Sequence, residues 1–331
     1  MWQAEKALRA WVASRGMQQD QLKNSFGVAG ESGQRQSSSS SKSRDAIEPY
    51  QYDPIVWLYY GAYSVLRGSY VFVKLVINCH ALLRGLFSGI WLGLLRHKTL
   101  LKINRFYYSR TKKYKDFSYN KSGLWAWERM IIARYFRICK RLLLIGAGGG
   151  REVLALRRLG YEVHGFECNS ELVRVANALL NEEGLSSSVR FAPPDMCPNG
   201  EASRPIYDGL IVGWGAYMLI RGHDKRVAVL RKMRAQVHAG APLLVSFFCR
   251  SPKTKQFLVS TAVGNSLRRV LGRENIEVGD ALEPEYVHYF TQEEITGELR
   301  DAGFMLEYYT EVPYGHAVGI ASLNVHLLTC S

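Results

Sequence analysis

The sequence predicts an α/β fold with a doubly wound, mainly parallel sheet over its last two thirds and a helical segment before it. Two observations lead to this prediction. After Lys140, short apolar runs alternate with amphipathic runs of helical period, which is typical of parallel strands covered by helices on both faces. At the first junction, "IGAGGG" (145–150) places glycines between a strand and a helix, where such turns bind nucleotides.

The composition is that of a globular protein without a structural metal. With 331 residues and 47% hydrophobic content, the chain can bury a large core. Its six cysteines form no C-x-x-C pair and no Cys/His group at metal spacing, so we expect reduced thiols and no zinc site. Glu5, Lys6, Arg9 and Arg15 interrupt the first residues, which does not fit a secretory signal, and we expect a cytoplasmic protein.

Three regions differ in composition. Residues 1–48 include the Ser-rich run "ESGQRQSSSSSKSRD", too poor in apolar residues to order itself. Residues 49–121 are basic and apolar, and we interpret them as a helical cap. Residues 122–331 carry the strand–helix alternation and form the predicted nucleotide-binding domain.

The cap holds most of the chain's net charge of +14. No Asp or Glu occurs between residues 54 and 115, whereas eleven Lys and Arg do. Such a segment indicates a nucleic acid, an anionic membrane surface or a phosphorylated substrate as partner, unless it is only a solvated face.

Two interpretations of residues 50–101 stay open. They form either a cap that packs on the main domain or an element in a membrane interface, which would place the protein peripherally at the inner membrane face. Short uncharged runs and Arg84 speak against a spanning helix. Gly85, Gly89 and Gly93 form a row of small residues that permits close helix contact in either case.

The elements of the main domain follow in order. A helix is expected at 122–136. Strands are predicted at 141–146, 161–167, 188–193, 207–214 and 241–248, with helices at 150–160, 169–184 and 224–237 between them. A late helix at 290–304 opens with a capping box of Thr291 and Glu294. A final strand pair covers 304–312 and 317–328.

The ligand of such a sheet lies at the carboxyl ends of the strands. Gly146 and Gly148 let the backbone approach it, and Glu167 ends the second strand, where an acid accepts hydrogen bonds from ribose. The dinucleotide pattern needs a third glycine where Arg151 stands. Asp195 follows the third strand, where an acid can accept from an adenine amino group. These features favour a methyl donor over NAD.

From residue 142 to 328 the sequence resembles the class I S-adenosylmethionine-dependent methyltransferases, through "IGAGGG", "GFECN", "PPDM", "VGWGAYMLI" and "HAGAPLLVSFF". The resemblance implies a Rossmann-like sheet of seven strands with a closing antiparallel strand. It implies S-adenosyl-L-methionine as cofactor, bound by Gly146, Ala147, Gly148, Gly150, Glu167, Cys168, Asp195, Met196 and Trp214. The family usually has an acid where this chain has Leu144, so another group must contact the amino group of the donor.

The acceptor is predicted to be a small molecule or lipid-like. Base amino-methyltransferases carry Asp or Asn and Pro-Pro-aromatic after the fourth strand, whereas residues 213–217 read GWGAY. The passage 288–304 resembles the small-molecule branch of the family. An RNA or protein acceptor, bound by the basic segment, is the alternative, and a non-catalytic nucleotide-binding protein of the same fold is a third.

Candidate bases are few. Methyl transfer needs the acceptor positioned and its proton removed. His316, before the last strand, is the first candidate, and His223, after the fourth strand, the second; Tyr217 is a further candidate for the pocket.

Overall fold

The computed structural model describes residues 54–193 and 206–323. The chain divides into two units, residues 1–63 and 64–331. In the first unit, the described residues are the opening turns of helix α2 (Pro54–Leu94), where Tyr59 contacts Tyr60 and Tyr63. The Ser-rich tail lies outside the described residues, and the boundaries at residues 48 and 121 stay predictions.

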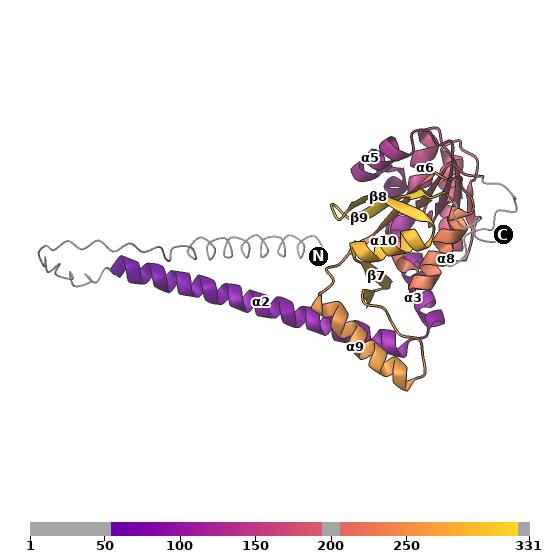
Figure 1. Ribbon diagram of the computed structural model, residues 1–331. Coiled ribbons are helices and arrows are strands. Elements are labelled where there is room, and N and C mark those ends of the chain that lie inside the picture. The colour runs from indigo at the N-terminus through magenta and orange to yellow at the C-terminus, as the bar shows by residue number, and fades with distance from the viewer. Residues whose placement is uncertain (1–53, 194–205, 324–331) are drawn as a thin grey trace, which may run out of the picture. The chain divides into compact units, whose positions relative to one another are not determined.

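A nine-stranded sheet runs through the described part of the second unit (Figure 1). Its strands are β1 (Arg141–Ile145), β2 (Glu162–Glu167), β3 (Val189–Phe191), β4 (Gly209–Val212), β5 (Pro242–Cys249), β6 (Asp280–Leu282), β7 (Tyr286–Phe290), β8 (Phe304–Thr310) and β9 (Gly315–Ala321). The strands β3, β2, β1, β4 and β5 are parallel neighbours in that order. Strand β9 lies antiparallel beside β5, and β8 pairs with β9. These seven strands confirm the predicted Rossmann-like sheet with its closing antiparallel strand.

Helices cover both faces of this sheet because its strands are apolar on both sides. Leu142 and Leu144 pack in one hydrophobic cluster and Leu143 in the other, since successive side chains of a strand point to opposite faces. On the first face lie α5 (Ala126–Tyr135), α6 (Arg151–Arg158) and α7 (Ser170–Glu182). On the second lie α8 (His223–Arg234) and α10 (Gln292–Asp301).

The helices of the main domain begin and end close to the residues predicted from the sequence, with one larger difference. Thr291 and Glu294 form the predicted capping box of α10. The helix expected at 122–136 begins only at Ala126, because Gly123 has a φ of 81° and the Glu128 carboxylate accepts a hydrogen bond from the Trp125 N–H. The residues before it form separate short helices, η1 (Lys112–Lys115) and α4 (Phe117–Lys121).

An insertion that the sequence did not reveal follows β5. It consists of α9 (Lys255–Val270) and the hairpin of β6 and β7. Strand β7 pairs with the last two residues of β5, where β9 has already left it. The insertion shares a small core of Leu92, Leu100, Ile276, Leu282 and Tyr286 with α2 and α3 (His97–Arg110).

Helix α2 lies beside α9 in Figure 1, and the predicted row of small residues lies in the contact between the two helices. A Cβ atom added to Gly85 would lie 2.6 Å from the Gln256 carbonyl oxygen, and one added to Gly89 would lie 2.7 Å from that of Ser260. Arg268 of α9 donates hydrogen bonds of 2.9 and 2.7 Å to the Leu92 carbonyl. The end of α2 is therefore fixed to the main domain.

By length and composition, Leu58–Leu94 is the one stretch among the described residues that meets the requirements of a membrane-spanning helix, and 11% of its apolar window is buried. From the sequence, the short uncharged runs and Arg84 spoke against a spanning helix. In the structure these runs belong to one continuous helix, α2. Arg84 pairs with Glu283 of the insertion, so Arg84 does not have to enter lipid.

We expect alanine substitutions at two α2 glycines to have different effects on the free energy of unfolding. Gly89→Ala should lower the free energy of unfolding by about 1–3 kcal/mol through overpacking against α9. Gly68→Ala has no atom within 4 Å of its new Cβ and should leave that free energy unchanged or slightly raised, since alanine favours helix. Urea denaturation of both variants tests this; equal stability of the two would contradict the observed helix contact.

Candidate functional site

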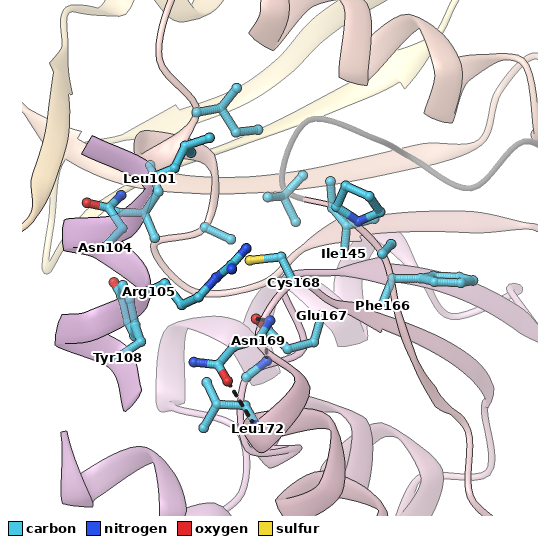
Figure 2. A pocket seen from close by; sticks show the side chains of 18 of the residues that line it. Leu101, Asn104, Arg105, Tyr108, Ile145, Phe166, Glu167, Cys168, Asn169 and Leu172 are labelled. Carbon is cyan, nitrogen blue, oxygen red and sulfur yellow. Dashed lines mark hydrogen bonds between the residues drawn. The ribbon is translucent and has the colours of Figure 1, made fainter. Parts of the chain in front are cut away.

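A cavity opens at the carboxyl ends of β1, β2 and β4, where the strand order reverses (Figure 2). Such crevices are the binding sites of open α/β sheets. From the sheet and its loops it is lined by Ile145, Gly146, Gly148, Phe166, Glu167, Cys168, Asn169, Ala192, Pro193, Val212, Trp214 and Ala216. Asp195 and Met196, the predicted adenine contacts, lie outside the described residues.

Two of the four predicted loop residues line this cavity. Gly146 and Gly148 do so with φ angles of 72° and 53°, and a Cβ on Gly146 would lie 2.3 Å from that of Ala216. Ala147 is buried in the core instead, and a Cβ on Gly150 would contact Ala176 of α7 at 3.1 Å. Neither Ala147 nor Gly150 lines the cavity, and their contacts with the ligand stay a prediction.

Glu167 is in the position expected of a ribose acceptor. One carboxylate oxygen accepts from the Gly148 N–H at 2.8 Å and the other from the Asn169 N–H at 2.9 Å. Each oxygen keeps a lone pair for a ligand hydroxyl. The carboxylate therefore fixes the glycine loop and remains able to bind a ribose.

Cys168 and Asn169 continue this wall. Burial, followed by the Glu167 carboxylate, raises the pKa of the Cys168 thiol to about 12, so the thiol stays protonated and is no nucleophile at neutral pH. The Asn169 side chain caps α7 and donates to Ser109 of α3 at 3.2 Å.

The opposite wall comes from the basic, aromatic stretch before the sheet. Leu101, Asn104, Arg105, Tyr108 and Tyr114 line the cavity. The Asn104 amide is held by the Tyr286 backbone. Figure 2 shows Arg105 extending from α3 toward Cys168.

These wall residues are the part of the site that we did not single out from the sequence. The signal was present in "KINRFYYSRTKKY", where aromatic and basic residues alternate. Nothing in that pattern tells which face of the helix meets the strand ends. Phe166 and Asn169, beside the acid of the second strand, could have been inferred from position alone.

Trp214 lines the cavity as expected from the resemblance. Its backbone N–H donates to Glu152 at 3.0 Å, and its ring contacts Trp125 and Tyr314 at centroid distances of 4.8 and 4.6 Å. The ring is therefore held in one place beside the glycine loop.

Arg151, which occupies the third-glycine position of dinucleotide sites, belongs to a buried ion cluster. Its guanidinium donates to Glu128 at 2.7 and 2.6 Å and to Glu152 at 2.8 Å. Leu144, where the family has an acid, is fully buried in the core. It cannot reach a ligand, and Glu152 is already engaged by Arg151 and Trp214.

His316, the first predicted base, does not line the cavity. It is 1% exposed in β9, and its ring stacks on Trp127 at 4.3 Å. Its Nδ1–H donates to the Tyr314 carbonyl at 2.8 Å, and burial lowers the pKa of the imidazole. The Nε2 atom is buried and has no hydrogen-bond partner among the described residues. Because His316 does not line the cavity, the geometry does not support its direct contact with an acceptor.

His223 and Tyr217 belong to a polar network away from the cavity. Both bind Glu298, a buried carboxylate that also accepts from Arg226 at 2.6 Å. Burial, and then Glu298, raises the pKa of Tyr217 far above its usual value. Neither residue lines the cavity, so a catalytic role for His223 or Tyr217 has no geometric support. Both were predicted as candidates because they follow β4 in the chain.

One set of side chains within the described ranges has metal-ligand spacing: Glu277, Asp280 and His288. Asp280 already accepts from Tyr286 and His288 at 2.7 Å, and Glu277 pairs with Arg226. These contacts are those of an ion-pair network.

Comparison with known proteins finds likeness in fold alone. No family description and no curated protein matches the sequence. Among solved structures, an S-adenosylmethionine-dependent methyltransferase from Methanosarcina mazei is similar at 19% identity and a TM-score of 0.48, over 61% of this chain and 99% of that one.

Two further solved structures are also similar in fold. One is the Burkholderia thailandensis 1,6-didemethyltoxoflavin-N1-methyltransferase with bound S-adenosylhomocysteine (15% identity, TM-score 0.48, 70% of this chain and 92% of that one). The other is the [4+2]-cyclase SpnF (17%, 0.41, 55% and 57%).

We expect Glu167→Ala to weaken S-adenosylmethionine binding at least about tenfold, since a lost hydrogen bond to a charged group is worth about 1.5–3 kcal/mol. Glu162→Ala, on the exposed start of the same strand, is the matched control and should bind normally. Calorimetry measures both, and equal affinities of the two variants would exclude Glu167 from the site.

Proposed function

We propose that this protein is an S-adenosylmethionine-dependent methyltransferase whose acceptor is a small molecule or lipid-like. One observation carries the proposal: the glycine loop and the Glu167 carboxylate share one cavity with an apolar, aromatic wall from α3 and η1. The glycine loop and the Glu167 carboxylate fit the nucleoside end of the donor. The wall from α3 and η1 leaves a largely apolar space for an acceptor.

The wall suits a small acceptor better than a nucleic acid base. Leu101 and Tyr108 of this wall and Leu219, Ile220 and Val229 beside it are among the apolar residues that line the cavity. Tyr217, which stands where base methyltransferases hold their target nitrogen, is turned away and bonded to Glu298.

Arg105 indicates that the acceptor carries a negative charge. Its guanidinium lies in the cavity, and within the described ranges it makes no hydrogen bond or ion pair. The donor itself has one net positive charge, so the donor and the Arg105 guanidinium together exceed the single negative charge of the Glu167 carboxylate. An anionic group on the acceptor would balance it and could bind the guanidinium in bidentate fashion.

The chemistry asked of the chain is mainly positioning. When bound, the donor supplies an electrophilic methyl group. Trp214, fixed by Glu152 and its aromatic neighbours, would shape the methyl end of the cavity, while Arg105 would orient the acceptor. No histidine lines the cavity in the described ranges, so we favour an acceptor atom that needs no strong base.

Arg105→Met should lower kcat/KM for the acceptor at least about tenfold through a higher KM, because a charge-assisted contact is lost. Donor affinity should not change. Lys102→Met removes an exposed cation of the same helix that does not line the cavity and is the control. Weaker donor binding in Arg105→Met would instead assign the guanidinium to the donor.

The activity itself can be tested with isotope-labelled S-adenosylmethionine and fractionated lipid and metabolite extracts. We expect label in one small anionic product, with none from the Glu167→Ala variant. Label in RNA or protein would favour the alternative acceptors, and donor binding without any transfer would favour a non-catalytic protein.

A further inference from the structure

One face of α2 carries a continuous row of exposed apolar side chains. At roughly 100° per residue, they fall in a sector about 60° wide along the helix. Their exposed fractions run from 42% to 74%. The row consists of Val65, Phe72, Val76, Leu83, Phe87, Ile90 and Leu94.

The opposite face of the helix has a different character. Arg67, Lys74 and Asn78 fall in one sector there. The same sector, further along the helix, holds Gly85 and Gly89, which lie against α9. The polar residues and the body of the protein are therefore on one side of α2 and the apolar row is on the other, although further exposed apolar side chains, such as Leu66, Val71 and Leu75, lie outside the row.

Helix α2 and the segment that follows it are rich in positively charged residues. Residues 54–115 contain no acid, and the segment that follows α2 exposes Lys98, Lys102, Arg110, Lys112 and Lys113. A protein partner with an apolar surface would leave these cations unused. Anionic lipid headgroups would bind them, since each juxtamembrane cation is attracted to an anionic leaflet.

The polar sector also decides how such a helix would meet a bilayer. In a spanning helix, Lys74 would lie deep in hydrocarbon, which is costly. In a helix that lies along the interface, Arg67 and Lys74 face headgroups and water.

We propose that α2 lies in the interface of an anionic bilayer, with its apolar row in the acyl region and the methyltransferase domain on the water side. This docking does not depend on the chemistry of the cavity.

The test compares two double variants of the full chain. Val76→Glu/Leu83→Glu changes the apolar row, and Val71→Glu/Leu82→Glu changes neighbouring residues near the polar side. The four native side chains are similarly exposed: Val71 58%, Val76 49%, Leu82 47% and Leu83 64%. Both variants add the same charge, so electrostatic losses are equal.

Binding is measured by co-sedimentation with phosphatidylcholine vesicles, with and without phosphatidylglycerol. The native chain should bind the anionic vesicles, and salt should weaken binding because it screens surface charge over about 10 Å at 0.1 M. The row variant should lose at least about tenfold in affinity relative to the control variant, since apolar burial is lost.

Other outcomes overturn the proposal. Equal losses in the two variants would mean that lipid surrounds α2, as in a spanning helix. A native chain that binds neither vesicle, or a row variant that binds like the control, would remove the membrane as partner. Thermal unfolding of both variants checks that the fold is retained. We expect unchanged unfolding temperatures because the substituted positions are exposed.

Discussion

The close approach at Gly149 is the constraint on which the site depends. A Cβ atom there would lie 2.0 Å from the Tyr114 carbonyl oxygen and 2.5 Å from Nδ2 of Asn120. Only a bare backbone lets η1 and α4 lie against the glycine loop. The glycine loop therefore has contacts on two sides. Gly146 and Gly148 line the cavity, and Gly149 packs against the segment that carries Tyr114 and Asn120. The donor site and its wall are built on the same glycine loop.

This arrangement explains why α3 can serve two surfaces. The helix carries Arg105 and Tyr108 into the cavity and also exposes Lys98 and Lys102. Helix α2, directly before it, carries the apolar row. If the row lies in a bilayer, the wall of the cavity is held near lipid headgroups, where anionic amphiphiles are concentrated. The proposed acceptor class and the proposed docking surface then agree in charge, although each has its own test.

The sequence predicted the sheet because its strands are continuous apolar runs separated by amphipathic helices, a local pattern. Glu167, Gly146, Gly148 and Trp214 were found because they follow strands at fixed positions. The insertion with α9 and β7 was missed: its strands are short, and β7 pairs with only two residues of β5. His316, His223 and Tyr217 were misjudged in placement because chain position near a strand end does not reveal direction. Trp127 and Glu298, distant in sequence, determine where these side chains point.

The central claim is that the glycine loop, the end of β2 and the α3–η1 segment close one cavity around the methyl donor. Hydrogen exchange of the full chain, with and without S-adenosylhomocysteine, tests it most directly. We predict that the ligand protects residues 145–149, 167–172 and 104–114 together and leaves residues 65–83 of α2 unchanged. Protection that omits residues 104–114, or that NAD produces equally, would contradict the account.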